Sequence, residues 1–349
     1  MSVKKVNFKY VFLIFLLCIG KISGQERIKS IVVDTLLIDK ISIRGIIVEQ
    51  NKVWYAGNQG RYGLIDLQTK LKTENQIPDG SKLEFRSIAA NSKFVYLLAI
   101  GNPALLYQVS KTSNEIKLVY QENHEKVFYD SMQFWNETDG IAMGDPIANT
   151  FSIITTQNGG NSWKKTPTQK IPLLKNGEAA FAASNSNIVI RGNKSWIVSG
   201  GKEARVFYSS NKGKSWKVYE TPIVKGEEMT GIFTSDFYDL KNGFIAGGNY
   251  DKPNQNFGNK AITIDGGKSW NLVGEHTGPG YISCVQYFPE SNGKRLITVG
   301  ATGIHYTTNS GETWIQISDD KNLFTIRFLD KFTAIAAGNG KMIRLRFEY

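Results

Sequence analysis

An eight-residue turn motif occurs four times in this chain and constrains its fold more than any other feature. Each copy reads Ser/Thr-x-Asp/Asn-x-Gly-x-Ser/Thr-Trp and follows a short alternating apolar run. The Asp or Asn side chain can accept hydrogen bonds from backbone N–H groups ahead of it, and the Gly takes the positive φ of a tight turn. The Trp supplies an apolar plate against neighbouring strands. The motif therefore predicts four structural hairpin turns, whose defining residues are Asn158, Gly160 and Trp163; Asn211, Gly213 and Trp216; Asp265, Gly267 and Trp270; and Asn309, Gly311 and Trp314.

These octapeptides resemble the Asp-box (BNR) repeat of bacterial neuraminidase-type, or sialidase-like, β-propellers. One copy carries Asp265 and the other three carry Asn, which can make the same turn contacts. In such propellers the box lies between the outer strands of a blade, away from the axis. The resemblance therefore implies a structural role for the four turns.

A second repeat covers most of the chain. Short apolar strands end in Gly at seven places, positions 57, 101, 144, 200, 247, 300 and 338. An apolar or aromatic segment, such as Phe181-Ala182-Ala183 in the fourth repeat, lies upstream of each and is predicted to be an innermost strand. The spacing is that of four-stranded propeller blades. We therefore expect an all-β chain that forms a single seven-bladed β-propeller.

The last predicted blade has only three strands after residue 320. The segment Ser30 to Ile38 precedes the first blade and has no other partner. We expect this N-terminal strand to complete the last blade and close the ring. No Pro-rich or Ser-rich linker divides the chain, so residues 25–349 are predicted to form one domain.

The first 24 residues have the pattern of a secretory signal peptide. Lys4, Lys5 and Lys9 precede an apolar run over residues 10–19, and small residues follow up to Gly24. Cleavage near Gly24 would export the chain to the periplasm or the cell exterior, with no membrane-spanning segment left. A lipid anchor at Cys18 is the alternative, but the preceding residues lack the small side chain that such processing favours.

The composition limits the classes of partner and cofactor that we expect the mature chain to bind. Loss of the predicted signal peptide removes four Lys and no acid, which lowers the formal charge from +11 to +7. The remaining Lys and Arg are scattered and no nucleic-acid motif accompanies them, so nucleic-acid binding is not expected. Cys284 lies in a predicted apolar strand, and we expect its thiol to be buried and unreactive. The three His residues lack metal-ligand spacing and no dinucleotide-binding Gly motif is present, so we expect no metal and no cofactor.

Candidate binding residues lie just after the repeated glycines and at the starts of the inner strands, because propellers bind ligands where loops converge at the axis. Two interpretations remain open: these side chains bind an acidic or sugar ligand, or Arg and carboxylate groups pair across blades and lock the channel. The candidates are Arg44, Arg86, Asn102, Asp130, Asp145, Glu178, Arg205 and Tyr250.

A glycoside hydrolase is the alternative function. Neuraminidase-type enzymes use Arg residues for a substrate carboxylate, together with a Tyr, a Glu and an Asp, and other propeller glycosidases use two carboxylates. In this chain Asp145, Glu178 and Tyr250 would be the catalytic residues. The Arg-Ile-Pro signature of neuraminidases is absent, however, and Arg44-Gly45-Ile46 stands in its place. An oxidoreductase is not favoured, because the cofactor motifs are missing.

A further resemblance is to the photosystem II stability and assembly factor family of seven-bladed propellers and its exported relatives in non-photosynthetic bacteria. It rests on Ser42-Ile43-Arg44-Gly45-Ile46, on the segment 53–60 and on the Gly-Gly-Lys-Ser-Trp form of the box. The resemblance implies a non-catalytic platform with an Arg patch, for which Arg44, Arg86, Arg205 and Arg327 are the counterparts. We therefore expect an exported, monomeric binding or assembly platform that recognises a protein or glycan partner of the cell envelope.

Overall fold

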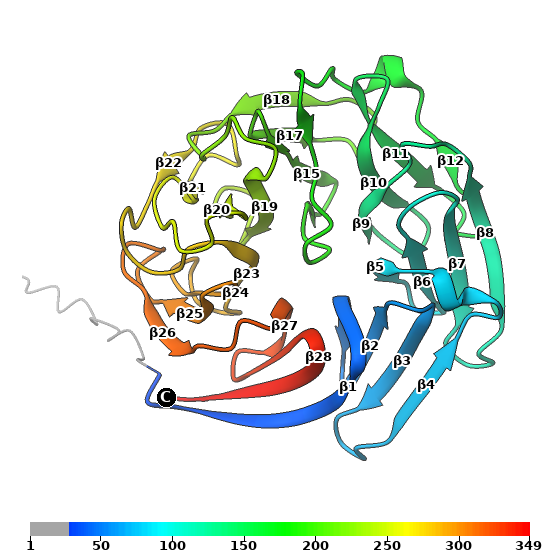
Figure 1. Ribbon diagram of the computed structural model, residues 1–349, viewed down its shortest axis with the longest axis horizontal. Coiled ribbons are helices and arrows are strands. Elements are labelled where there is room, and N and C mark those ends of the chain that lie inside the picture. The colour runs from blue at the N-terminus through cyan, green and yellow to red at the C-terminus, as the bar shows by residue number, and fades with distance from the viewer. Residues whose placement is uncertain (1–27) are drawn as a thin grey trace, which may run out of the picture.

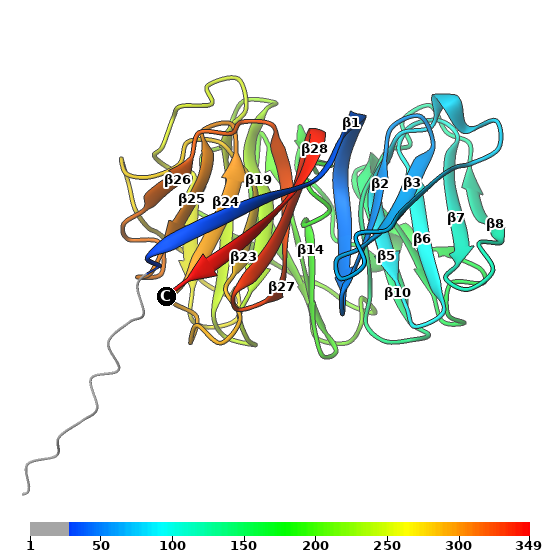
Figure 2. The ribbon, with the colours of Figure 1, turned by 90° about the horizontal axis from the view of Figure 1, so that it is seen from below.

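The computed structural model describes residues 28–349, which form a ring of β-sheets around a central axis (Figure 1). The fold is an all-β propeller. Antiparallel strands run in order from the axis to the rim in the four-stranded sheets, and the side view shows the strands spanning the thickness of the ring (Figure 2). The predicted signal peptide and Cys18 lie outside the described residues.

Four of the sheets contain four strands each. Their strands, from one edge to the other, are β5 (Phe85–Ala90), β6 (Phe94–Ala99), β7 (Ala104–Ser110) and β8 (Ile116–Glu122); β9 (Tyr129–Phe134), β10 (Gly140–Ile147), β11 (Thr150–Thr156) and β12 (Lys164–Lys165); β14 (Ile188–Arg191), β15 (Lys194–Val198), β17 (Arg205–Ser209) and β18 (Lys217–Glu220); and β23 (Ile282–Tyr287), β24 (Leu296–Gly300), β25 (Gly303–Thr307) and β26 (Ile315–Ser318).

Two sheets contain six strands each. One holds β13 (Glu178–Ala179), β16 (Gly200–Gly201), β19 (Thr230–Phe237), β20 (Gly243–Asn249), β21 (Lys260–Thr263) and β22 (Asn271–Leu272). The other holds β27 (Leu323–Asp330), β28 (Thr333–Glu348), β1 (Ser30–Glu49), β2 (Lys52–Gly57), β3 (Arg61–Asp66) and β4 (Lys72–Gln76). Two short 3-10 helices, Gly80–Lys82 and Thr168–Lys170, lie in connections.

The predicted pairing of Ser30 to Ile38 with the last strand is present. The prediction of seven blades is wrong, because the described strands pair into six sheets. The reason is the length of β1, which runs for 20 residues without interruption. Its first part pairs with β28, from Ser30 opposite Glu348 onward, and its last part pairs with β2. One strand therefore joins the two ends of the chain into a single sheet instead of capping a blade of its own.

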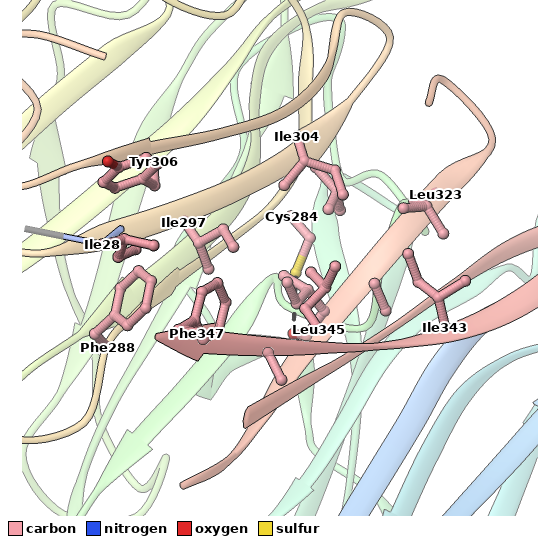
Figure 3. Close-up of a cluster of buried hydrophobic side chains, with 14 residues drawn as sticks. Ile28, Cys284, Phe288, Ile297, Ile304, Tyr306, Leu323, Ile343, Leu345 and Phe347 are labelled. Carbon is pink, nitrogen blue, oxygen red and sulfur yellow. Dashed lines mark hydrogen bonds between the residues drawn. The ribbon is translucent and has the colours of Figure 1, made fainter. Parts of the chain in front are cut away.

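Apolar side chains fill the space between neighbouring sheets. Figure 3 shows one such cluster, in which Cys284, Phe288 and Ile297 of the β23–β26 sheet meet Leu345 and Phe347 of β28. The Cys284 side chain is fully buried there, and its Sγ lies 3.7 Å from the carbonyl oxygen of Ile326. Burial of these side chains between sheets is the main favourable contribution to the stability of the ring.

The four repeated octapeptides fold into four turns that share three hydrogen bonds among the Ser/Thr hydroxyl, the Asp/Asn oxygen and the backbone. In the third, Asp265 Oδ1 accepts from Thr263 Oγ1 at 2.8 Å and from the Ser269 N–H at 3.0 Å. The Gly267 N–H donates to Thr263 Oγ1 at 3.0 Å, and Gly267 has a φ of +86°, which a residue with a Cβ rarely adopts. Each turn joins the two strands at one edge of its sheet, between β11 and β12, β17 and β18, β21 and β22, and β25 and β26.

One predicted inner strand is absent. Phe181-Ala182-Ala183 is irregular, and the regular strand of that repeat begins only at Ile188. Residues 180–187 run instead along the axis, where side chains from several sheets hold them. We call residues 180–187 the axial segment. No helix in the described part of the chain is long and apolar enough to cross a membrane.

Candidate binding site at the propeller axis

The first residues of the inner strands meet at one end of the axis, because the strands all begin at that end. Arg44 lies where the part of β1 that pairs with β2 begins, and its guanidinium carbon is 4.2 Å from the centre of the Phe324 ring. Its Nη1 donates to the carbonyl oxygen of Ala183 at 3.1 Å. Burial lowers the pKa of Arg44, and the positive charge of nearby Arg86 lowers it further. The two arginines are therefore neighbours, and Arg44 has no ion-pair partner among the described residues.

Arg86 is held differently. Its Nε donates to Glu84 at 2.7 Å, and its guanidinium carbon lies 5.8 Å from the centre of the Phe128 ring. The Arg86 side chain is 27 % exposed and the Glu84 side chain 37 %, so this pair is in contact with solvent and weak. Arg86 can therefore exchange this partner for another anion.

Aromatic rings surround the two arginines. Phe181 stacks on Phe233 with ring centres 3.8 Å apart, and Tyr281 meets Phe233 edge-on at 4.8 Å. Tyr250 meets Tyr281 edge-on at 5.1 Å and is 51 % exposed, within electrostatic range of Arg44. We call Arg44, Arg86, Phe128, Tyr250 and Phe324 the arginine face. It combines two cations with π surfaces, a combination that suits acidic and aromatic ligand groups.

Two carboxyl groups lie buried beside this face. Neither oxygen of Asp130 has a hydrogen-bond partner among the described residues. Burial, followed by the charge of Asp145, raises the pKa of Asp130 well above its ordinary value. Asp145 Oδ1 accepts from the Ala180 N–H at 3.0 Å, and burial raises the pKa of Asp145 to about 6. The pair therefore favours protonated forms in mildly acidic conditions.

Glu178 and Arg205 form a buried ion pair away from the arginine face. The Arg205 Nε lies 3.0 and 3.1 Å from the two Glu178 oxygens, and the Glu178 side chain is completely buried. Glu178 also accepts from Ser199 Oγ at 2.6 Å and from the Lys175 N–H at 2.9 Å. All four contacts stabilise the ionised carboxylate, which leaves it no free lone pair for a substrate.

The remaining sequence candidates are scattered. Asn102 is exposed in the turn between β6 and β7, and its bond to Pro103 is cis. Arg327, which sequence position grouped with Arg44, points to the other end of the axis and donates from Nη2 to the carbonyl oxygens of Ser184 and Asn185. The structure thus brings together Arg44, Arg86 and Tyr250, with Asp130 and Asp145 beside them, and separates Arg205 and Arg327 from them.

The axial segment is the part of this region that sequence reasoning missed. Asn185 accepts from Ser87 Oγ at 2.9 Å and from the Met132 N–H at 3.0 Å, and donates to the Ile88 carbonyl oxygen at 2.7 Å. Ser184 Oγ donates to the Ser283 carbonyl oxygen at 2.6 Å. The polar run Ser184-Asn185-Ser186-Asn187, where other repeats have apolar residues, was the available signal. The segment closes the axis between its two ends.

At the end opposite the arginine face the last residues of the inner strands surround a cavity of about 540 Å³. Asn185 contributes to its floor, and Ile46, Phe134 and Phe328 are among its apolar walls. This cavity also escaped sequence reasoning, because its lining comes from strand ends that are far apart in sequence.

No family model matches the chain, and no curated protein matches it in sequence. Solved structures do match. YCF48 bound to a D1 peptide has a TM-score of 0.66 at 12 % identity, over 91 % of this chain and 95 % of that chain. YCF48 from Cyanidioschyzon merolae has a TM-score of 0.65 at 11 % identity, over 90 % of this chain and 98 % of that chain. The protein shares its propeller fold with YCF48.

The fold is shared more widely. The RRP9 WD40 repeats match with a TM-score of 0.62 at 11 % identity, over 90 % of this chain and 97 % of that chain. At these identities the comparisons establish the fold alone. YCF48 is a photosystem II assembly factor, so the structural comparison agrees with the sequence resemblance at the level of the fold.

Proposed function

We propose that this protein is a non-catalytic binding platform that holds an acidic segment of a protein partner on its arginine face. The observation that carries the proposal is the uncompensated charge of Arg44, which rests on a ring and a carbonyl oxygen beside the weakly paired Arg86. A carboxylate could form charge-assisted hydrogen bonds with both arginines. The similar structure of YCF48 bound to a D1 peptide supports a peptide as the occupant.

The contacts of the candidate catalytic residues also favour a binding platform over a glycoside hydrolase. Glycoside hydrolysis in the two-carboxylate scheme needs an acid and a second carboxylate that both face the substrate. Glu178 is buried and engaged by Arg205, Ser199 and Lys175. Tyr250, the third residue of the alternative, contacts Tyr281 and no carboxylate in the described structure. These contacts favour recognition through cations and rings.

A fluorescence anisotropy measurement tests the proposal. The probe is a labelled Glu-rich peptide, compared with a peptide in which every Glu is replaced by Gln. Loss of two charge-assisted contacts in an Arg44→Gln/Arg86→Gln variant should weaken binding of the Glu-rich peptide by roughly tenfold or more. The matched control is Arg344→Gln/Arg346→Gln, which removes the same charge from β28 on the outer part of the ring, where both arginines contact Asp34.

Equal weakening by both double variants would show that only net charge matters and would contradict a site at the arginine face. Failure of the Glu-rich peptide to bind better than the Gln peptide would contradict an acidic partner. If the protein bound an envelope glycan and no peptide, the partner would be a glycan and not a protein.

We further propose that the protein is exported after cleavage near Gly24, on the basis of the basic and apolar pattern of residues 1–24. The intact mass of the protein purified from its native envelope fraction tests this. A chain that begins at Gln25 is expected. A chain that retains Met1 in the cytoplasm would contradict export, and a lipid-modified Cys18 would replace free export with an anchor.

A further inference from the structure

The cavity at the end of the axis opposite the arginine face contains a cation without an anionic partner. Arg327 of β27 donates from Nη1 to the carbonyl oxygen of Ile326 at 2.7 Å, to Thr325 Oγ1 at 3.1 Å and to Cys284 Sγ at 3.1 Å. Its Nη2 donates to the carbonyl oxygens of Ser184 and Asn185 at 3.0 and 3.1 Å. None of these acceptors is a carboxylate. Arg327 forms no ion pair among the described residues, and its Nε–H has no acceptor there.

The other charged groups at the cavity compensate one another. Arg191 lies 3.2 Å from Asp236, whose second oxygen accepts from the Tyr287 N–H at 2.7 Å. Glu49 pairs with Lys111 at 2.5 Å. The charge of Arg327 also acts on Asp236, so Arg191, Arg327 and an ionised Asp236 together leave one positive charge in excess. The hydrogen bonds to the axial segment fix the guanidinium in place, so a ligand would find it already oriented.

The walls give the cavity a second property. Ile46, Phe134, Tyr238 and Phe328 contribute apolar surface around the fixed cation. A volume of about 540 Å³ lies within the range of small-molecule sites, about 300–1,000 Å³. Polar side chains such as Gln133 and Gln286 also line the cavity, so its walls are mixed. The cavity therefore combines one anchoring charge with room for an apolar body.

We propose that this cavity binds a small organic acid, whose carboxylate accepts from the Arg327 Nε–H and whose apolar part lies against Ile46 and Phe328. The site is separate from the arginine face, because the axial segment lies between the two ends: Ala183 contacts Arg44, and Ser184 and Asn185 contact Arg327. It therefore does not depend on the function proposed above.

Calorimetric titration with two acids and their amides tests the proposal. The probes are phenylacetate and hexanoate, each compared with phenylacetamide and hexanamide, which have nearly the same shape and no charge. Loss of a hydrogen bond between charged groups corresponds to about tenfold in affinity, so at least one acid should bind about tenfold more tightly than its amide.

Three variants locate the site. Arg327→Gln should weaken binding of the acid about tenfold and leave the amide nearly unchanged. Ala90→Trp, at the end of β5, should abolish binding by filling the cavity without touching Arg327. Because Arg327 also holds the axial segment, Ala90→Trp is decisive if Arg327→Gln does not fold. Arg346→Gln removes the same charge from the half-exposed side of β28 and should bind like the unaltered protein.

No binding of either acid at about 10 mM, where even a millimolar site would be mostly occupied, would overturn the proposal. Equal affinity for acid and amide, or unaltered affinity in a folded Ala90→Trp variant, would overturn it too.

Discussion

Individual carboxyl groups near the axis have opposite electrostatic surroundings. Glu178 has an arginine, a hydroxyl and a backbone N–H to stabilise its charge, whereas Asp130 has no hydrogen-bond partner among the described residues. The residue types alone made both of them candidates for the binding site, and made Glu178 a candidate for catalysis as well. Only the neighbours that the fold brings in, such as Arg205 for Glu178, distinguish a structural ion pair from a titrating acid.

The buried pair gives the first prediction. Glu178→Gln leaves Arg205 buried without a counter-charge, which should lower the free energy of unfolding by about 3–5 kcal/mol. Glu203→Gln, which removes a more exposed partner of Lys225, should cost less than about 1 kcal/mol. Urea denaturation at pH 7 measures both, and equal costs would show that the Glu178 to Arg205 pair is not the buried anchor described above.

The second prediction concerns pH. Burial raises the pKa of Asp145 in the folded state to about 6, above its unfolded value, so the folded protein holds the proton more tightly. Stability from this group is therefore present at pH 4 and is lost as the pH rises through about 6. Asp145→Asn removes this titrating group. As the pH rises from 4 to 7.5, the unfolding free energy of the variant should therefore increase by about 3 kcal/mol relative to that of the unaltered protein. Denaturation at both pH values tests this; a difference between the two proteins that does not change with pH would contradict it.

At the scale of elements, strands were predictable and the axial segment was not. Gly-terminated apolar runs such as Phe244 to Gly247 repeat locally, and β20 forms there as expected. Residues 180–187 have no period, and their partners lie far away in sequence: Ser87 is 98 positions from Asn185. The candidate strand Phe181-Ala182-Ala183 failed because a strand needs a ladder partner, and these residues instead meet the ends of several sheets.

The axial segment carries the third prediction. Asn185 has a φ of +55° and joins two inner strands through its side chain. Asn185→Ala should cost about 3 kcal/mol or more, since it leaves the Met132 N–H and the Ile88 carbonyl unpaired and keeps an unfavourable backbone conformation. Asn185→Gly deletes the same side chain but tolerates this φ, so it should be about 1 kcal/mol less destabilising. Chemical denaturation compares the variants, and a neutral Asn185→Ala would show that the segment does not hold the ring together.

At the scale of the whole molecule, closure depends on β1. The repeat pattern indicated a closed ring and an N-terminal closing strand, but it overcounted the sheets because nothing local in the sequence shows that one strand runs unbroken from residue 30 to residue 49. The axial cavity was also beyond sequence reasoning, since Arg327 meets Ser184 across 143 positions. Global contacts of this kind follow from ring geometry and leave no periodic trace.

The fourth prediction follows from this closure. Deletion of residues 30–38 removes the strand that pairs with residues 341–348 and exposes apolar side chains such as Leu345 and Phe347. The thermal transition should fall by more than about 10 °C or lose its cooperativity, because several kcal/mol of apolar burial disappear. Deletion of residues 25–27 alone is the control and should leave the transition in place. Scanning calorimetry distinguishes the two, and an unchanged transition in the longer deletion would show that the ring is stable while open.

The pairing of β1 with β28 also orders events during synthesis. The ribosome makes Ser30 to Ile38 long before residues 341–348, and 318 positions separate Ser30 from Glu348, so the two halves of this ladder cannot meet until residues 341–348 have emerged. Until then, the apolar strand edge formed by Ser30 to Ile38 has no neighbouring strand. Two side chains of this strand, Val33 and Ile38, are still 54 % and 79 % exposed in the finished ring. The ring of the nascent chain is therefore kept open until residues 341–348 emerge, and during that time this edge is accessible to chaperones.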